Sequence, residues 1–258
     1  FRGIGRYTLA LAKAIAANRA DHEVLIALNG LLPDTIEPIR AAFDPLLPQE
    51  NIRVWSAPGP VRELEEDNAL RRELAERIRE AFLASLNPDI VHVGSLFEGF
   101  GDNAVTSIGL FAPHLRTAVS LHDLIPLKFP DPHPAFRQYY SRKLQSFVRA
   151  GLWLGVSEFS CREAVALLGL RAGSVVTVPN AADPVFTRLE ITPAERDQIM
   201  QRHGLQKPFV CWVGTPEPRK NVAGLMQAFV RLAPEVRSRF QLLLIGKMQT
   251  GDLDALKE

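Results

Sequence analysis

RTAVSLHD, residues 116–123, is an apolar run that ends in a histidine and an aspartate. A short apolar run of this kind is typical of a strand buried in a parallel sheet. Further short runs separated by amphipathic stretches occur at residues 22–28, 51–56, 90–93, 152–156, 175–178, 209–213 and 241–245. Up to residue 178 this alternation predicts an α/β fold built on one doubly wound parallel sheet, and the last two runs begin a second sheet. Helices are predicted over residues 62–86 and 158–168, and the prolines of residues 126–134 predict an irregular loop.

Bulk composition excludes several classes of protein. The 258 residues are 47% hydrophobic, and their net charge of +1 provides no general attraction to nucleic acid. Cys161 and Cys211 are too few and too far apart for a disulfide framework or a zinc knuckle, so we expect both to be buried apolar side chains in a reducing compartment. No apolar run reaches the length of about 18 residues needed to cross a bilayer.

Two domains are predicted, with a boundary in the segment 179–186. Residues 1–186 form a Rossmann-like domain, and residues 187–258 begin a second one. Thr192 and Glu195 have the spacing of a capping box at the start of its first helix. The chain opens in a loop with no preceding strand and stops inside a starting helix. We therefore expect a fragment that lacks the first strand of one domain and most of the other.

Gly3 and Gly5 open the first helix of the chain. Glycine allows close backbone approach, and helix N-termini offer free amides to a phosphate. The third glycine of a dinucleotide fingerprint is missing, and Asn29 stands where a ribose-binding carboxylate would follow the first strand. These departures argue against a Rossmann oxidoreductase. A structural turn and a ligand loop both remain open for this segment.

His122 follows the carboxyl end of an apolar strand, where open α/β sheets bind ligands. An imidazole there suits hydrogen bonding to a sugar or phosphate, or acid–base chemistry. The alternative is a purely structural role, in which His122 caps the following turn and Asp123 forms an Asx turn.

VGTPEPRKN, residues 213–221, ends a strand, turns at Gly214 and places Arg219 and Lys220 just before a helix. Cations beside helix amides form a site for an anion, most naturally a diphosphate. Solvated surface is the alternative for such a basic pair.

A helix that Pro134 opens is predicted to run to Ala150, and it is basic and amphipathic. Phe136, Tyr140, Leu144 and Phe147 share one side of it, whereas Arg137, Arg142, Lys143 and Arg149 lie elsewhere around it. Such a helix lies on an anionic membrane or packs on a sheet with its cations solvated.

Taken in order, six segments resemble glycosyltransferase family 4, particularly its bacterial mannosyltransferase-like members. They are GIGRYT, SLFEGF, SLHDLIP, VSEFS, VPNAADP and VGTPEPRKN. Two positions depart from the family pattern: Ala181 replaces a usual glycine, and Thr215 stands where many members have an arginine.

The resemblance implies a GT-B fold, in which an N-terminal acceptor domain faces a C-terminal domain that binds a nucleotide sugar. It implies a hexosyltransferase, by family a mannosyltransferase of bacterial polysaccharide synthesis, which retains anomeric configuration and acts on a saccharide or lipid-linked acceptor. No metal or other cofactor is expected, and the location implied is the cytoplasm or the inner face of its membrane. A non-catalytic module of the same fold, which binds a nucleotide sugar or saccharide, is the alternative.

By the same resemblance, His122 approaches the transferred sugar as the catalytic residue. The residues implied at the donor are Gly3, Gly5, Gly214, Thr215, Arg219 and Lys220. Those implied near the sugar or acceptor are Arg6, Glu98 and Asp123. The family's pair of glutamates would lie beyond Glu258, so we expect the isolated 258-residue chain to transfer no sugar.

Overall fold

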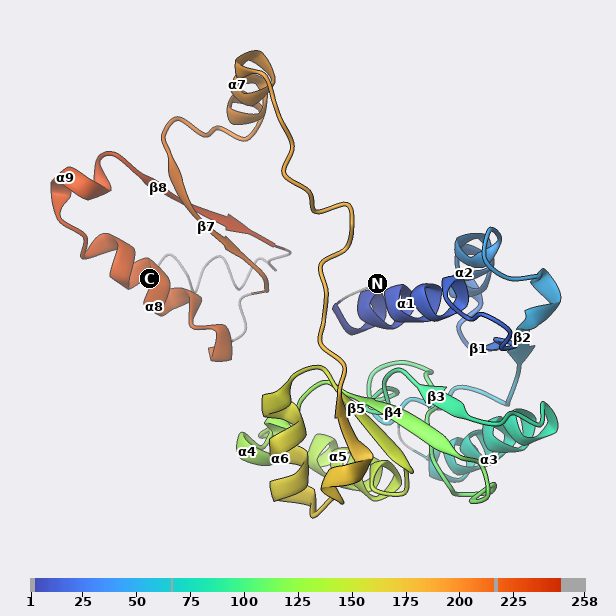
Figure 1. Ribbon diagram of the computed structural model, residues 1–258. Helices are drawn as coiled ribbons and strands as arrows, with labels where there is room; N and C mark the ends of the chain where they lie inside the picture. The colour runs from blue at the N-terminus through green and yellow to red at the C-terminus, as the bar shows by residue number, and fades with distance from the viewer. Residues whose placement is uncertain (1–2, 66, 216–217, 247–258) are drawn as a thin grey trace. The chain divides into compact units, whose positions relative to one another are not determined.

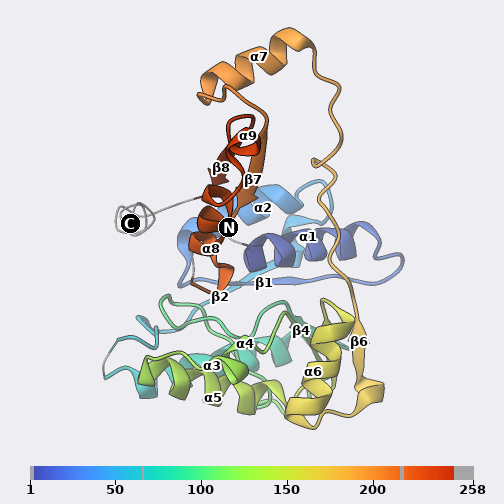
Figure 2. The ribbon, with the colours of Figure 1, turned by 90° about the vertical axis from the view of Figure 1, so that its left-hand side faces the viewer.

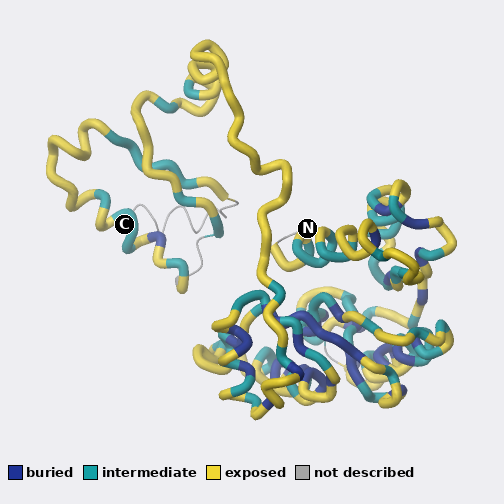
Figure 3. Tube along the Cα trace, viewed as in Figure 1, coloured by how far each residue is buried: buried dark blue, intermediate teal, exposed yellow. Residues whose placement is uncertain are grey.

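The computed structural model describes residues 3–65, 67–215 and 218–246 (Figure 1). The chain divides into two compact units, Phe1–Pro184 and Val185–Glu258. Residues 181–199, around this division, are all exposed (Figure 3). Each unit is an α/β arrangement of parallel strands and helices.

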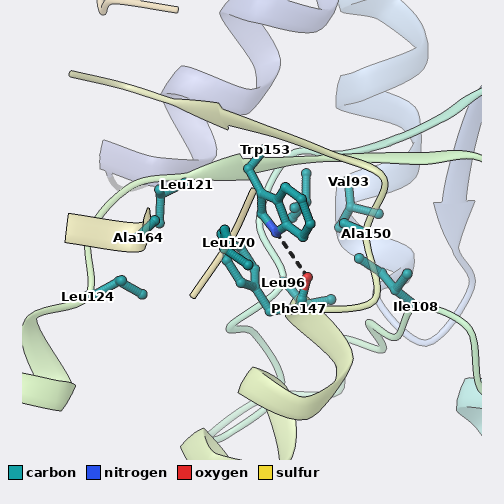
Figure 4. Packing of buried hydrophobic residues seen from close by; sticks show 11 residues of the cluster. Val93, Leu96, Ile108, Leu121, Leu124, Phe147, Ala150, Trp153, Ala164 and Leu170 are labelled. Carbon is teal, nitrogen blue, oxygen red and sulfur yellow. Dashed lines mark hydrogen bonds between the residues drawn. The ribbon is translucent and has the colours of Figure 1, made fainter. Parts of the chain in front are cut away.

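The main sheet of the first unit has four parallel strands in the order β3-β4-β5-β6. Their bounds are Val91–Val93, Thr117–Leu121, Leu152–Gly155 and Val175–Thr177. All five residues of β4 are buried, Thr117 and Ser120 included, as expected for a strand inside a parallel sheet. In the core under this sheet, the Trp153 indole donates a hydrogen bond of 3.1 Å to the carbonyl of Phe147 (Figure 4).

A second, two-stranded sheet lies in the same unit. β1 (Ile26–Asn29) pairs in parallel with β2 (Ile52–Trp55), and α1 (Gly3–Ala17) and α2 (Ile36–Phe43) contribute to its separate core. The expectation of one continuous sheet is therefore not met. Apolar periodicity predicts where strands form, but strand pairing depends on contacts between segments far apart in sequence.

The helix predicted over residues 62–86 is shorter than expected, because α3 spans Ala69–Ser85. The backbone amides of Glu63 and Leu64 donate instead to the carbonyls of Gly99 and Phe100, at 2.9 and 3.1 Å. These tertiary hydrogen bonds hold the preceding stretch against the loop around residue 100.

Three further helices complete the first unit: α4 (Ile125–Lys128), α5 (Pro134–Phe147) and α6 (Glu158–Leu168). The bounds predicted for α6 are confirmed, and α5 begins at Pro134 as predicted. α4 lies in a proline-rich segment for which an irregular loop was predicted. Short 3-10 turns span Pro33–Thr35, Gln49–Asn51 and Ala172–Ser174.

Two cations of α5, Arg142 and Lys143, form ion pairs, contrary to the prediction of solvated cations, whereas Arg137 is exposed. Lys143 is 3% exposed, and its ammonium lies 2.9 Å from a carboxylate oxygen of Glu76 in α3. Arg142 bridges Glu76 and Glu63. Burial lowers the pKa of Lys143, and Glu76 opposes that effect. The two helices are seen next to one another in Figure 2. Because Arg142 and Lys143 are both held in ion pairs, this face of α5 gives little support to contact with a membrane.

Glu80 ties α3 to the segment before β4. Its buried carboxylate accepts hydrogen bonds from the amides of Leu110, Phe111 and Ala112 at 3.1, 2.6 and 3.0 Å, and from the hydroxyl of Ser107 at 2.7 Å. Burial disfavours the charged form, but these donors outweigh it and lower the pKa of Glu80. This carboxylate therefore stabilises the conformation of residues 107–112.

The second unit contains a parallel pair, β7 (Phe209–Val213) and β8 (Gln241–Ile245), with the bounds predicted for them. Its helices are α7 (Pro193–Arg202), α8 (Val222–Val230) and α9 (Pro234–Arg237), and a 3-10 turn spans Pro218–Lys220. The predicted capping box of Thr192 and Glu195 is present. Cys161 is buried as expected, whereas Cys211 in β7 is exposed, because the described part of this unit covers little of its sheet.

We expect Glu80→Gln to lower the free energy of unfolding by about 2–3 kcal/mol, since it weakens acceptance from several buried amides. Glu73→Gln is the matched control, because Glu73 pairs with Arg77 at an exposed site of the same helix. This substitution should lower the free energy of unfolding by less than about 1 kcal/mol. Urea unfolding followed by tryptophan fluorescence measures both. Equal losses would contradict this role for Glu80.

The same carboxylate predicts a pH dependence of stability. The folded-state pKa of Glu80 is lowered, so its contribution is complete above the unfolded value of about 4.3 and is lost as pH falls through the folded value. Unfolding free energy measured from neutral pH down to about pH 3 should fall less steeply for Glu80→Gln than for the unaltered chain. Identical slopes would show that Glu80 does not contribute.

Candidate functional site

His122 and Gly94 lie side by side at the carboxyl ends of neighbouring strands. β4 ends at Leu121 and β3 at Val93, and the Nε2 of His122 donates to the carbonyl of Gly94 at 3.0 Å. The backbone carbonyl of His122 accepts from the hydroxyl of Ser160, in α6, at 3.1 Å. The imidazole is thus held at the sheet edge where the sequence predicts a ligand.

Helix α1 reaches this edge through Tyr7 and Thr8. The ring of Tyr7 meets the His122 ring edge to face, with 4.9 Å between centroids and 83° between planes. A Cβ on Gly94 would lie 2.5 Å from Cγ2 of Thr8, so only glycine allows this approach. Gly3, Gly5 and Arg6 form the first turn of the same helix, which brings the predicted glycine segment to the side of the sheet that carries His122.

Asp123 forms an Asx turn, which is the structural alternative predicted for it. Its carboxylate accepts from the amide of Ile125 at 3.0 Å, and the residue is exposed. His122 does not cap that turn, because its ring is bonded to Gly94 instead.

Glu98 lies in a loop anchored on α5 by aromatic side chains. Phe97 stacks on Tyr140 with 4.8 Å between centroids, and Phe100 packs against Tyr139 at 5.3 Å. The carboxylate of Glu98 accepts from the hydroxyl of Ser95 at 2.6 Å.

Each of the two tyrosines of α5 is affected by a different one of the carboxylates Glu98 and Asp123. Burial raises the pKa of Tyr139 and of Tyr140, and negative charge on Glu98 adds to the first shift and on Asp123 to the second. Sequence reasoning missed Tyr7, Tyr139 and Tyr140. Only Tyr7 carries a sequence signal, since it stands within the glycine motif GIGRYT.

In the second unit, the four predicted donor residues gather where β7 ends. The amide of Gly214 donates to Ile245 at 2.9 Å, which closes the end of the strand pair. The ammonium of Lys220 donates to the hydroxyl of Thr215 at 2.9 Å. Arg219 is exposed in the adjoining 3-10 turn, and Pro216 and Glu217 between them lie outside the described residues.

Helix α8 starts directly after Lys220. Asn221 caps it in a left-handed conformation, with φ of 50°, and accepts from the amide of Gly224 at 3.2 Å. The structure therefore brings a lysine, an arginine and a helix N-terminus together, as the motif predicts.

A pocket of about 480 Å³ lies elsewhere in the first unit, between α3 and α5. Arg72, Glu76, Arg142 and Lys143 line it, and none of the predicted site residues does. Among the described residues, no cluster of three or more His, Cys, Asp or Glu side chains is arranged to hold a metal ion. No described helix is long and apolar enough to cross a membrane.

Comparison with known proteins gives a consistent result. The family model for Glycosyltransferase Family 4 matches residues 1–186. The serotype-specific mannosyltransferase WbdA of Escherichia coli is 30% identical over 99% of this chain, which spans 31% of WbdA. The O-antigen chain mannosyltransferase B of Escherichia coli is 30% identical over 95% of this chain, which spans 60% of that protein.

Solved structures support the fold. Anabaena Alr3699/HepE in complex with UDP superposes with a TM-score of 0.61 and 16% identity, over 99% of this chain and 61% of that one. Its complex with UDP-glucose gives a TM-score of 0.58, also at 16% identity, over 97% of this chain and 60% of that one. These matches confirm the predicted α/β class and GT-B type. On its residues, its fold and the match over residues 1–186, the chain belongs to glycosyltransferase family 4.

Proposed function

We propose that the protein carrying this chain transfers a hexose, mannose by analogy with its relatives, from a nucleoside-diphosphate sugar to a saccharide acceptor. The observation that carries the proposal is the cluster of Thr215, Arg219 and Lys220 between the end of β7 and the start of α8. Support for a nucleotide-sugar donor comes from the UDP and UDP-glucose complexes of the structurally similar HepE.

The chemistry of transfer explains why such a cluster is needed. When the bond between sugar and diphosphate breaks, negative charge develops on the leaving phosphate. Preorganised cations and backbone amides that stabilise this charge lower the barrier by several kcal/mol. Lys220 and Arg219 supply the cations in this proposal, and the first turn of α8 supplies the amides.

Thr215 has a specific part in this scheme. It occupies the position where many family members have an arginine, and its hydroxyl accepts from the ammonium of Lys220. We propose that this contact orients Lys220 toward the diphosphate. We also assign Gly3 and Gly5 to donor binding, through their backbone, because neither carries a side chain.

The first unit would provide the sugar and acceptor side. His122, Arg6, Glu98 and Asp123 are the groups we assign to it, because His122 lies at the end of β4 and Asp123 follows it directly. The names of the relatives, O-antigen chain mannosyltransferase B and serotype-specific mannosyltransferase, support a bacterial surface polysaccharide or its lipid-linked precursor as acceptor. Transfer with retention of configuration is part of the proposal.

In the whole protein that carries this chain, Lys220→Ala should lower kcat/KM for transfer by about a hundredfold, since one preorganised donor to the leaving group is lost. Lys220→Arg should keep part of the activity because it keeps the charge. Lys207→Ala, which removes another lysine of the same unit from an exposed site before β7, should have no effect. Release of nucleoside diphosphate from GDP-mannose and UDP-glucose, with acceptor present, measures all three. Equal activity of Lys220→Ala and Lys207→Ala would refute the assignment.

The diphosphate assignment makes a separate prediction for binding. GDP or UDP should bind more tightly than the matching monophosphate, and Lys220→Ala should reduce this ratio toward one, because the lost charge acts on the second phosphate. Calorimetric titration of the four nucleotides, with NAD as a further ligand, measures the ratios. A ratio that Lys220→Ala leaves unchanged would place the diphosphate elsewhere, and tight NAD binding would favour an oxidoreductase.

A further inference from the structure

The hydrogen bond between His122 and Gly94 determines which ring nitrogen of His122 carries the proton. A backbone carbonyl only accepts, so Nε2 must donate to it. In the neutral ring the hydrogen therefore sits on Nε2, and Nδ1 carries the lone pair. No hydrogen bond to Nδ1 is found within the described residues, so this nitrogen is the one left for a ligand.

Tyr7 packs against the same imidazole from α1. The edge-to-face contact of the two rings, at 4.9 Å, limits rotation of His122 about its side-chain bonds. The hydroxyl of Tyr7 is buried and has no hydrogen-bond partner within the described part of the chain. Since a buried hydroxyl without a partner is unfavourable, we attribute the placement of Tyr7 to its ring rather than to its hydroxyl.

Gly94 allows both the hydrogen bond from His122 and the close approach of α1. Its carbonyl accepts from His122, and its missing side chain leaves room for Thr8, one residue after Tyr7. Threonine is restricted to few rotamers in a helix, so an added Cβ at Gly94 would displace α1 rather than only turn the Thr8 side chain. Gly94 thus couples the position of α1 to that of the His122 ring.

We infer that Tyr7 is a positioning residue which, with the carbonyl of Gly94, holds His122 as the Nε2–H tautomer, so that Nδ1 accepts a hydrogen bond from a hydroxyl of the transferred sugar. This inference rests on the proposed function for the identity of the ligand. A phosphate oxygen is itself an acceptor, and it would bond to Nδ1 only after the ring took up a second proton. The neutral tautomer therefore selects a sugar hydroxyl over the diphosphate.

The tautomer is measured directly by long-range proton–nitrogen correlation NMR on protein with labelled histidine, at a pH of about 8.5, where free imidazole is neutral. His122→Gln identifies the signal of His122 among those of the other histidines. We expect the Nε2–H pattern in the unaltered protein and in Tyr7→Phe, which keeps the ring. We expect a mixture of tautomers in Tyr7→Ala and in Gly94→Ala. Phe159→Ala, which removes an exposed ring from α6, is the control and should leave the pattern unchanged.

An Nδ1–H pattern in the unaltered protein would overturn the inference. So would a pattern in Tyr7→Ala that equals that of the unaltered protein, or one in Tyr7→Phe that equals that of Tyr7→Ala. This readout needs no turnover, and its failure is therefore distinct from failure of the proposed transferase activity.

Kinetics and binding test the ligand of Nδ1. Tyr7→Ala should lower kcat/KM by about tenfold to a hundredfold, because a misplaced contact raises the barrier, while Tyr7→Phe restores it. The dissociation constant of the nucleoside diphosphate should stay the same in both variants, since the sugar and not the diphosphate meets Nδ1. Weaker diphosphate binding by Tyr7→Ala would overturn this part of the inference.

Discussion

Hydrogen bonding of β4 to a parallel neighbour on each side is the constraint on which the rest of the first unit depends. Every residue of the strand is buried, so its register with β3 and β5 cannot shift without moving the core. That register places His122 next to Gly94 at the end of β3. The position of the imidazole is thereby a consequence of strand pairing, and α1 then completes its surroundings with Tyr7.

Buried carboxylates of α3 fix its contacts with neighbouring segments of the same unit. Glu80 satisfies three backbone amides before β4, and Glu76 joins α3 to Lys143 and Arg142 of α5. Removing water from such groups is costly, and the surrounding hydrogen bonds offset that cost only in one arrangement. These contacts therefore specify the conformation of the loops at the strand ends. They also pair Arg142 and Lys143, two of the cations for which the sequence left membrane contact open.

Local patterns predicted the regular elements best where no distant contact competes. The bounds of α6, β7 and β8, and the capping box of Thr192, follow from apolar runs and cap residues within each segment. Prediction was wrong where distant segments compete for the backbone. Glu63 and Leu64 pair with the loop at Gly99 instead of extending α3, and the strands of the first unit form two sheets.

The sequence by itself determined the class of the fold, the family, and the strand ends at which His122, Gly214 and Lys220 stand. Apolar periodicity and short motifs carry that information, because each depends on residues close together in the chain. Only the tertiary structure decided that Tyr7 and Gly94 flank His122, that Thr215 accepts a hydrogen bond from Lys220, and that Arg142 and Lys143 of α5 pair with Glu76. The contacts around His122 and those of the α5 cations join residues far apart in sequence, whereas the contact between Thr215 and Lys220 bridges a turn. Their distances are set by how strands pair, helices pack and turns close, and no local pattern records them.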